Sequence, residues 1–134
     1  MAKLTEIEGI GATYAEKLTA AGITTTEALL EAAAGVKGRE KIAESTGISG
    51  KLILRWTNMA DLFRIKGVGE EYADLLEAAG VDTVPELAQR NPENLAVKMG
   101  EVNEEKKLVR QVPSETAVKG WVDQAKSLPR VVNY

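Results

Sequence analysis

The stretches Ile7-Glu8-Gly9-Ile10-Gly11 and Ile65-Lys66-Gly67-Val68-Gly69 carry the strongest fold signal in this 134-residue chain. In each stretch two glycines flank one apolar residue, and another apolar residue stands two positions before the first glycine. Glycine has no side chain, so such a pair permits a sharp backbone turn and the close approach of another group. Apolar residues at helical spacing follow both stretches. We therefore predict two tight turns, each leading into a helix with one buried face.

Both turns lie in an internal repeat. Between residues 7–30 and 65–88, at a constant offset of 58 residues, 11 of 24 positions are identical. The identical residues are glycines, small residues and core-forming residues: Ile7/Ile65, Gly9/Gly67, Gly11/Gly69, Tyr14/Tyr72, Ala15/Ala73, Leu18/Leu76, Ala20/Ala78, Ala21/Ala79, Gly22/Gly80, Thr25/Thr83 and Leu29/Leu87. Residues that set backbone shape and packing are thus repeated, whereas surface charges are not. The repeat predicts two units that share a fold more than a surface.

In the first unit we predict four short helices. The first ends at Gly22, where a left-handed backbone conformation favours glycine, and the second is capped by one of the threonines at 24–26. The third spans about 37–46 and ends at Gly47. The fourth spans about 49–64 and places Trp56 on its apolar face.

The second unit repeats this order with a difference. Its first helix ends at Gly80, and its second is capped by Asp82 or Thr83, with Pro85 in the first turn. Its third spans about 91–99 and ends at Gly100, and its last spans about 114–128, with Trp121 in place of Trp56. Between them lies a 12-residue insertion, within about 101–113, whose charged residues we interpret as a short extra helix capped by Asn103.

No linker rich in Gly, Pro or Ser separates the two copies. The first unit, residues 1–64, and the second, residues 59–134, are predicted to share the helix at 49–64 and to pack as one compact body. No stretch of alternating apolar and polar residues is long enough to predict a strand. The predicted fold class is all-α, with Trp56 and Trp121 in the core.

The composition restricts the function. Cysteine and histidine are both absent, which excludes disulfides, the usual zinc sites, cysteine nucleophiles and Ser-His-Asp triads. We expect no enzyme, no catalytic residue and no bound metal. No run reaches the roughly 18 apolar residues of a membrane helix, and residues 1–6 lack the features of a secretion signal, so we expect a cytoplasmic protein that does not bind membranes. The net charge of −3 is opposite in sign to that of most phosphate-binding proteins.

The two glycine stretches resemble the helix-hairpin-helix motif. The resemblance includes the downstream Ala15, Leu18, Gly22 and Leu29 and their counterparts, and it covers most of the chain. The duplicated arrangement looks especially like an uncharacterised bacterial family of tandem helix-hairpin-helix domains. The resemblance implies two SAM-like units of about four short helices. In helix-hairpin-helix proteins such turns bind DNA phosphates without reading bases. They need no cofactor, although some hold a monovalent cation with their backbone carbonyls.

Applied to this chain, the resemblance implies that the following residues bind nucleic acid: Gly9, Ile10, Gly11, Ala12, Thr13, Lys17, Lys66, Gly67 and Gly69. The two turns differ in charge. Thr13 and Lys17 follow the first turn and suit a phosphate, whereas Glu70 and Glu71 follow the second and would repel one. We therefore expect the first turn to bind, and we expect a bulky residue at Gly11 to damage both fold and binding. Alternatively, the glycines only shape a packing turn.

The sequence is compatible with two functions. One is sequence-independent binding of nucleic acid, most simply DNA, at the first turn. The other is a protein-interaction or scaffolding module without nucleic-acid binding, which the acidic balance favours. The sequence does not decide between these two partners, and it does not fix the oligomeric state.

Overall fold

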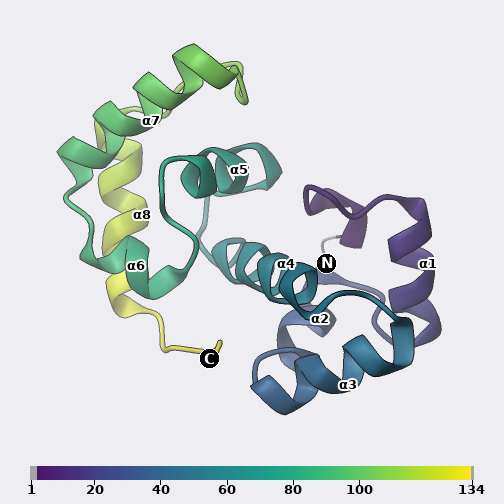
Figure 1. Ribbon diagram of the computed structural model, residues 1–134. Coiled ribbons are helices and arrows are strands. Elements are labelled where there is room, and N and C mark those ends of the chain that lie inside the picture. The colour runs from purple at the N-terminus through teal and green to yellow at the C-terminus, as the bar shows by residue number, and fades with distance from the viewer. Residues whose placement is uncertain (1–2, 134) are drawn as a thin grey trace. The chain divides into compact units, whose positions relative to one another are not determined.

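The structure, a computed structural model, describes residues 3–133. Within this range the chain forms eight α-helices, a short 3-10 helix and no strand (Figure 1). One isolated antiparallel bridge joins Lys3 to Thr25. The predicted all-α class is confirmed for these residues. By its internal contacts the chain divides into two units, Met1–Asp61 with Arg130–Tyr134, and Leu62–Pro129.

The first unit begins with the 3-10 helix η1 and continues with four α-helices. Their bounds are η1 Leu4–Glu6, α1 Ala12–Ala20, α2 Thr26–Ala32, α3 Val36–Thr46 and α4 Gly50–Leu62, the last residue of which falls in the second unit. Thr25 is the residue that caps α2, since its hydroxyl accepts from the Ala28 amide at 3.0 Å. Gly47 ends α3 with a φ of 74°, as predicted.

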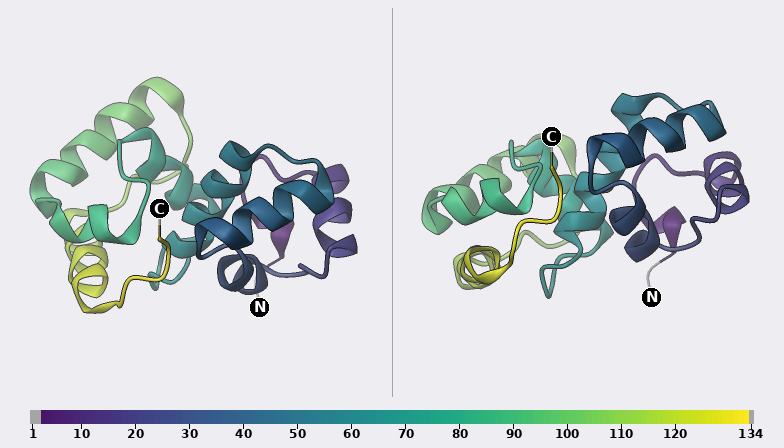
Figure 2. Two further views of the ribbon diagram at one scale, coloured as in Figure 1. Left: turned by 60° about the horizontal axis from the view of Figure 1, so that its bottom comes forward. Right: turned by 90° about the horizontal axis from the view of Figure 1, so that it is seen from below.

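The second unit has four helices of its own. They are α5 Glu70–Ala78, α6 Val84–Gln89, α7 Pro92–Lys106 and α8 Glu115–Ser127. Helices α6 and α7 both pack against α8, and α5 packs against α7. Figure 2 shows these helices from two further directions. Thr83 caps α6 by accepting from the Glu86 amide, and Pro85 lies in the first turn, as predicted.

Matching glycines end α1 and α5. Gly22 and Gly80 have φ values of 90° and 96°. After each, the next amide donates back to the helix: Ile23 to the Leu18 carbonyl at 2.9 Å, and Val81 to the Leu76 carbonyl at 2.8 Å. This pattern is the Schellman motif, in which an apolar residue beyond the glycine packs back onto the helix. The predicted ends of both helices are confirmed.

Each unit is centred on a tryptophan, as predicted. Trp56 is fully buried, and its ring lies 5.1 Å from the Tyr14 ring in an edge-to-face contact. Trp121 is 5% exposed, with the Tyr72 ring at 5.2 Å. These two aromatic pairs fix α1 and α5 to the core of their own units.

Residues 130–133 lie with the first unit. Their anchor is Arg39, a buried arginine that donates to the carbonyl oxygens of Ala33 at 2.8 Å and Asn133 at 2.6 Å. The Asn133 amide donates in turn to the Ala34 carbonyl at 2.8 Å, and Val132 is buried. The arginine thereby satisfies carbonyls at the end of α2 and beside it.

The insertion differs from its prediction. Helix α7 continues through Gly100 to Lys106, so neither the predicted helix end at Gly100 nor a new helix start at Asn103 occurs. The Asn103 side chain instead binds the backbone of Val109, accepting from its amide at 2.9 Å and donating to its carbonyl at 3.1 Å. The helix ends at Lys107, in the left-handed region with a φ of 52°. Helix-forming residues after Gly100 outweigh the modest cost of one internal glycine.

Replacing Gly100 with alanine is expected to raise the free energy of unfolding by about 0.5–1 kcal/mol, because alanine is favoured inside a helix. An added methyl would meet only Val112 Cγ1 at 3.9 Å, an ordinary contact. The matched substitution Gly47→Ala is expected to cost about 1 kcal/mol, because Gly47 is left-handed. Urea unfolding measures both. A loss of stability in Gly100→Ala would mean that α7 ends at this glycine.

Candidate functional site

The first glycine turn precedes α1. Gly9 has a φ of +95°, which residues with a side chain rarely adopt. Gly11 is the N-cap of α1 and has an ordinary φ of −87°. Between them the side chain of Ile10 is buried, 3% exposed, and its amide donates to the Ile7 carbonyl at 3.1 Å. The turn is therefore anchored by its middle residue, while both glycines are exposed.

The second glycine turn, which precedes α5, has the same geometry. Gly67 has a φ of +97°, Gly69 is the N-cap of α5, and Val68 between them is 5% exposed. The Val68 amide donates to the Ile65 carbonyl at 3.0 Å. Neither turn lies inside the core or within a regular helix, so both present backbone to solvent.

At the first turn the start of α1 offers backbone donors. Gly11 has no side chain to cap the helix, and within residues 3–133 no acceptor binds the amides of Ala12 and Thr13. Such amides point out along the helix axis at its positive end. The Thr13 hydroxyl is also exposed, and Lys17 lies one turn further along the same helix face. The Lys17 ammonium stands 5.9 Å from the centre of the Tyr14 ring.

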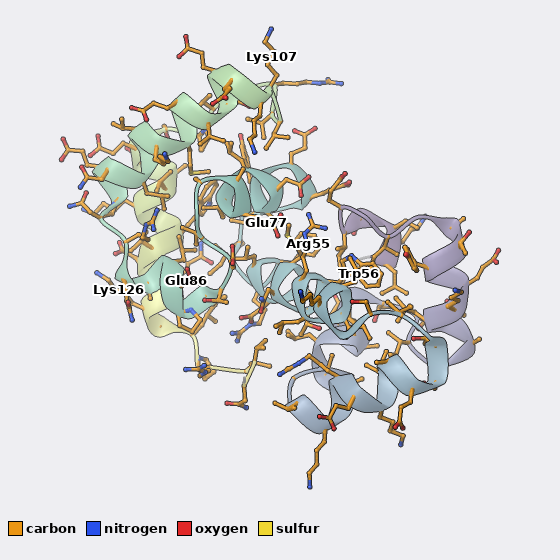
Figure 3. All side chains as sticks on the ribbon, viewed as in Figure 1. Arg55, Trp56, Glu77, Glu86, Lys107 and Lys126 are labelled. Carbon is orange, nitrogen blue, oxygen red and sulfur yellow. The ribbon has the colours of Figure 1, made fainter. Side chains whose placement is uncertain are left out.

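Helix α4 supplies an arginine and a tryptophan behind the first turn; Figure 3 labels both side chains. Arg55 donates from Nη1 to the Glu8 carbonyl at 3.1 Å. A methyl group on Gly9 would lie 3.1 Å from that nitrogen and 3.3 Å from Trp56 Nε1. The Trp56 N–H is buried and has no hydrogen-bond acceptor among residues 3–133. The first turn thus combines backbone donors, a guanidinium and an indole N–H.

The second turn has no counterpart of Arg55. Aligning Trp121 with Trp56 places Gly120 at the position of Arg55, and nothing lies within 4 Å of where its side chain would begin. The turn is held instead by Gln124, which accepts from the Lys66 amide at 2.8 Å and donates to the Lys66 carbonyl at 3.1 Å. Two exposed carboxylates, Glu70 and Glu71, stand at the start of α5. Arg110 also lies near this turn, since it lines the same recess as Glu70 and Glu71.

The predicted residues fall into two groups, one at each turn. Gly9, Ile10, Gly11, Ala12, Thr13 and Lys17 gather at the start of α1, and Lys66, Gly67 and Gly69 at the turn before α5. All are exposed except Ile10, which can offer only its backbone. The predicted set did not include Arg55. Its neighbour Trp56 was the available signal, because a core tryptophan fixes where the preceding residue lies.

The predicted role of Gly11 in the fold is wrong. Its φ is ordinary, and a methyl group built there meets nothing within 4 Å. The glycine that the turn requires is Gly9, because of its positive φ and its contact with Trp56.

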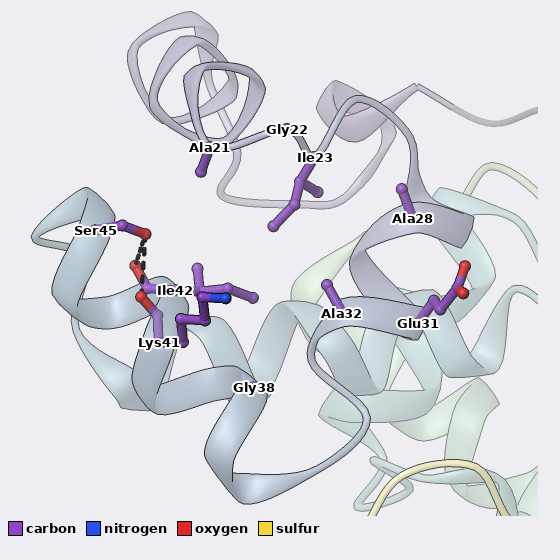
Figure 4. A pocket seen from close by; sticks show the side chains of 10 residues that line it. All are labelled: Ala21, Gly22, Ile23, Ala28, Glu31, Ala32, Gly38, Lys41, Ile42 and Ser45. Carbon is purple, nitrogen blue, oxygen red and sulfur yellow. Dashed lines mark hydrogen bonds between the residues drawn. The ribbon is translucent and has the colours of Figure 1, made fainter.

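The first unit also has a groove of about 500 Å³ beside the end of α1 (Figure 4). Its floor consists of small and apolar residues, among them Ile23, Ala32 and Ile42. Glu31 and Lys41 add one charge of each sign, and the Ser45 hydroxyl is already bonded to the Lys41 carbonyl at 3.0 Å. Nothing in this groove favours an anion.

Two further findings concern other site types. Among residues 3–133 no group of three or more acidic side chains is placed to hold a metal ion. In the same part of the chain, no helix has the length and apolar character that crossing a membrane requires.

Comparison with known proteins yields one match. A family model described as a domain of unknown function, DUF4332, matches residues 8–128. No curated protein and no solved structure matches the chain. The matched range includes both glycine turns and the insertion.

Proposed function

The chain belongs to the DUF4332 family, and we propose that it is a non-enzymatic module that binds the DNA phosphate backbone through its first glycine turn. We further propose that both units are helix-hairpin-helix units, of which only the first binds. The repeat of 11 identical residues and the matching φ values of Gly9 and Gly67 support this assignment.

The observation that carries the proposal is the cluster of donors at the first turn. The amides of Ala12 and Thr13 have no acceptor among the described residues, and the Arg55 guanidinium lies beside Gly9. A phosphate oxygen is the natural acceptor for helix N-terminal amides, and a guanidinium adds the charge that holds it. Lys17 extends the positive charge along α1.

Binding at this site is independent of base sequence. Backbone amides and cationic side chains contact phosphates, which are the same at every nucleotide. The exposed residues after Gly11 are Ala12 and Thr13, both too short to reach base edges past a phosphate. We therefore expect similar affinity for duplexes of unrelated sequence.

The proposal is tested by fluorescence anisotropy with a short labelled duplex at about 50 and 200 mM salt, over which phosphate binding weakens steeply. Lys17→Glu is expected to reduce affinity by roughly tenfold while leaving the fold intact, because Lys17 is exposed. The matched control is Lys37→Glu, an equal charge change at an exposed position on α3. Equal losses in both variants, or no anisotropy change at tens of micromolar protein in low salt, would contradict the proposal.

The second candidate function is protein interaction. The net charge of −3 and the apolar floor of the groove beside α1 favour it. A largely apolar interface changes little with salt, whereas phosphate binding does not survive high salt. The salt series therefore separates the two functions for any partner that is found.

A further inference from the structure

The groove beside the end of α1 has a counterpart in the second unit, and there an arginine occupies it. At the repeat offset of 58 residues, Ala32, which lines the groove, corresponds to Arg90. Arg90 directly follows α6, and its Nη2 donates to the Ala79 carbonyl at 3.2 Å. A methyl group built on Gly80 would lie 3.8 Å from the same nitrogen. The arginine therefore lies at the end of α5 and bonds a carbonyl there.

The first unit has the same helix end without the arginine. Ala32 has only a methyl side chain, which points into the groove in Figure 4. Nothing lies within 4 Å of a methyl group built on Gly22, the counterpart of Gly80. The Ala21 carbonyl, which corresponds to that of Ala79, has no donor among residues 3–133. The second unit thus shows the position and the bond of a side chain that the first unit lacks.

The chemistry of the groove suits a guanidinium on an apolar stem. Carbonyls at the end of a helix lie at the negative end of its dipole, so they favour a cation that can donate. The buried side chains of Ile23 and Ile42 offer an apolar floor to the methylene groups of that stem. Glu31 lines the groove, and its exposed carboxylate has no partner among residues 3–133. Lys41, exposed on α3, brings a positive charge to the same lining, which opposes a bound cation.

We propose that the groove beside α1 binds an arginine side chain from a segment of another protein, at the position that Arg90 has in the second unit. The guanidinium donates to the Ala21 carbonyl and pairs with Glu31. Lysine is a poorer ligand, because its ammonium lacks the planar fork of donors that bonds two acceptors at once. The inference does not rest on DNA binding at the first turn. It specifies the partner chemistry for the second candidate function, protein interaction.

The test titrates the ¹⁵N-labelled full chain with a pentapeptide, blocked at both ends, that carries one arginine between alanines. Two matched peptides carry lysine or citrulline instead, and citrulline has nearly the shape of arginine without its charge. We expect the arginine peptide at millimolar concentration to shift the amides of Gly22, Ile23 and Ile42 most, since these residues line the groove. Both matched peptides should bind at least about threefold more weakly.

Three exposed positions test the charges of the groove. Glu31→Gln is expected to weaken binding of the arginine peptide by about threefold, because it removes the paired carboxylate, and Lys41→Gln is expected to strengthen it by about as much. The matched control is Lys37→Gln, on the same helix as Lys41 but not in the lining of the groove. It should leave the affinity unchanged.

Supplying the missing side chain from within the chain gives a readout that needs no peptide. Ala32→Arg is expected to abolish peptide binding and to raise Tm by a few degrees, because the new guanidinium can bond the Ala21 carbonyl as Arg90 bonds that of Ala79. The control is Ala32→Met, a side chain without charge, which should give a smaller rise.

Three results would overturn the proposal: equal affinity for the citrulline peptide, no amide shift in the groove, or undiminished peptide binding by Ala32→Arg. Self-association of the wild-type chain that Ala32→Arg removes would make a second copy, whose Arg110 is exposed, the occupant, and would overturn the assignment to another protein. None of the substituted positions lies at the first glycine turn, so DNA binding measured on the same variants tests the proposed function separately.

Discussion

Replacing Gly9 with alanine is expected to lower the free energy of unfolding by about 2 kcal/mol. A φ of +95° costs an alanine roughly 1–2 kcal/mol. The added methyl would also stand 3.3 Å from Trp56 Nε1, on a fully buried side chain that has little room to move. Urea unfolding followed by far-ultraviolet circular dichroism measures the loss.

The matched control is Gly11→Ala, two residues away in the same turn. Its φ is −87° and nothing lies within 4 Å of the new methyl, so stability should change by less than about 0.5 kcal/mol. The two substitutions together distinguish Gly9, a glycine that the fold requires, from Gly11, which the fold does not require. Equal effects of the two substitutions would show that the turn does not have the conformation described above.

Reversing two charges at the first turn, with Lys17→Glu and Arg55→Glu together, is expected to reduce DNA affinity by about 100-fold at low salt. Each substitution replaces an attraction to phosphate by a repulsion, and the Arg55 guanidinium stands next to Gly9. The slope of log affinity against log salt should also fall, by about one for each phosphate contact that is lost.

The control for this variant makes the same charge change in the second unit, at Lys66 and Arg110, near the other turn. We expect little effect on affinity there, because the proposal assigns binding to the first turn alone. If the DNA affinity falls equally in both double variants, the loss is a general charge effect, and the first turn is not the binding site.

The sequence was sufficient to predict the all-α class and most helix ends. Gly22, Gly47 and Gly80 end helices in the left-handed conformation, and Thr25 and Thr83 cap the helices that follow. These features are local, since each depends on a residue and its immediate neighbours along the chain. The burial of Trp56 and Trp121 followed from their positions on apolar stripes.

The features that could not be predicted depend on residues far apart in the sequence. Arg55 reaches the first turn only because Trp56 packs beneath it, which helical spacing alone does not reveal. From the sequence alone Arg39 is indistinguishable from a surface arginine, because its hydrogen bond to the Asn133 carbonyl forms only in the folded chain. Gly100 was predicted to end a helix. In the structure α7 continues past it to Lys106, and Asn103 contacts Val109 beyond it.

The most direct test of the central claim is a titration of the ¹⁵N-labelled protein with a short DNA duplex, followed by amide chemical shifts. The account predicts that the amides of Gly11, Ala12 and Thr13 shift most, as the phosphate binds them, while those of Gly69, Glu70 and Glu71 stay nearly in place. DNA binding with unmoved amides at the start of α1, or with the largest shifts in the second unit, would contradict it.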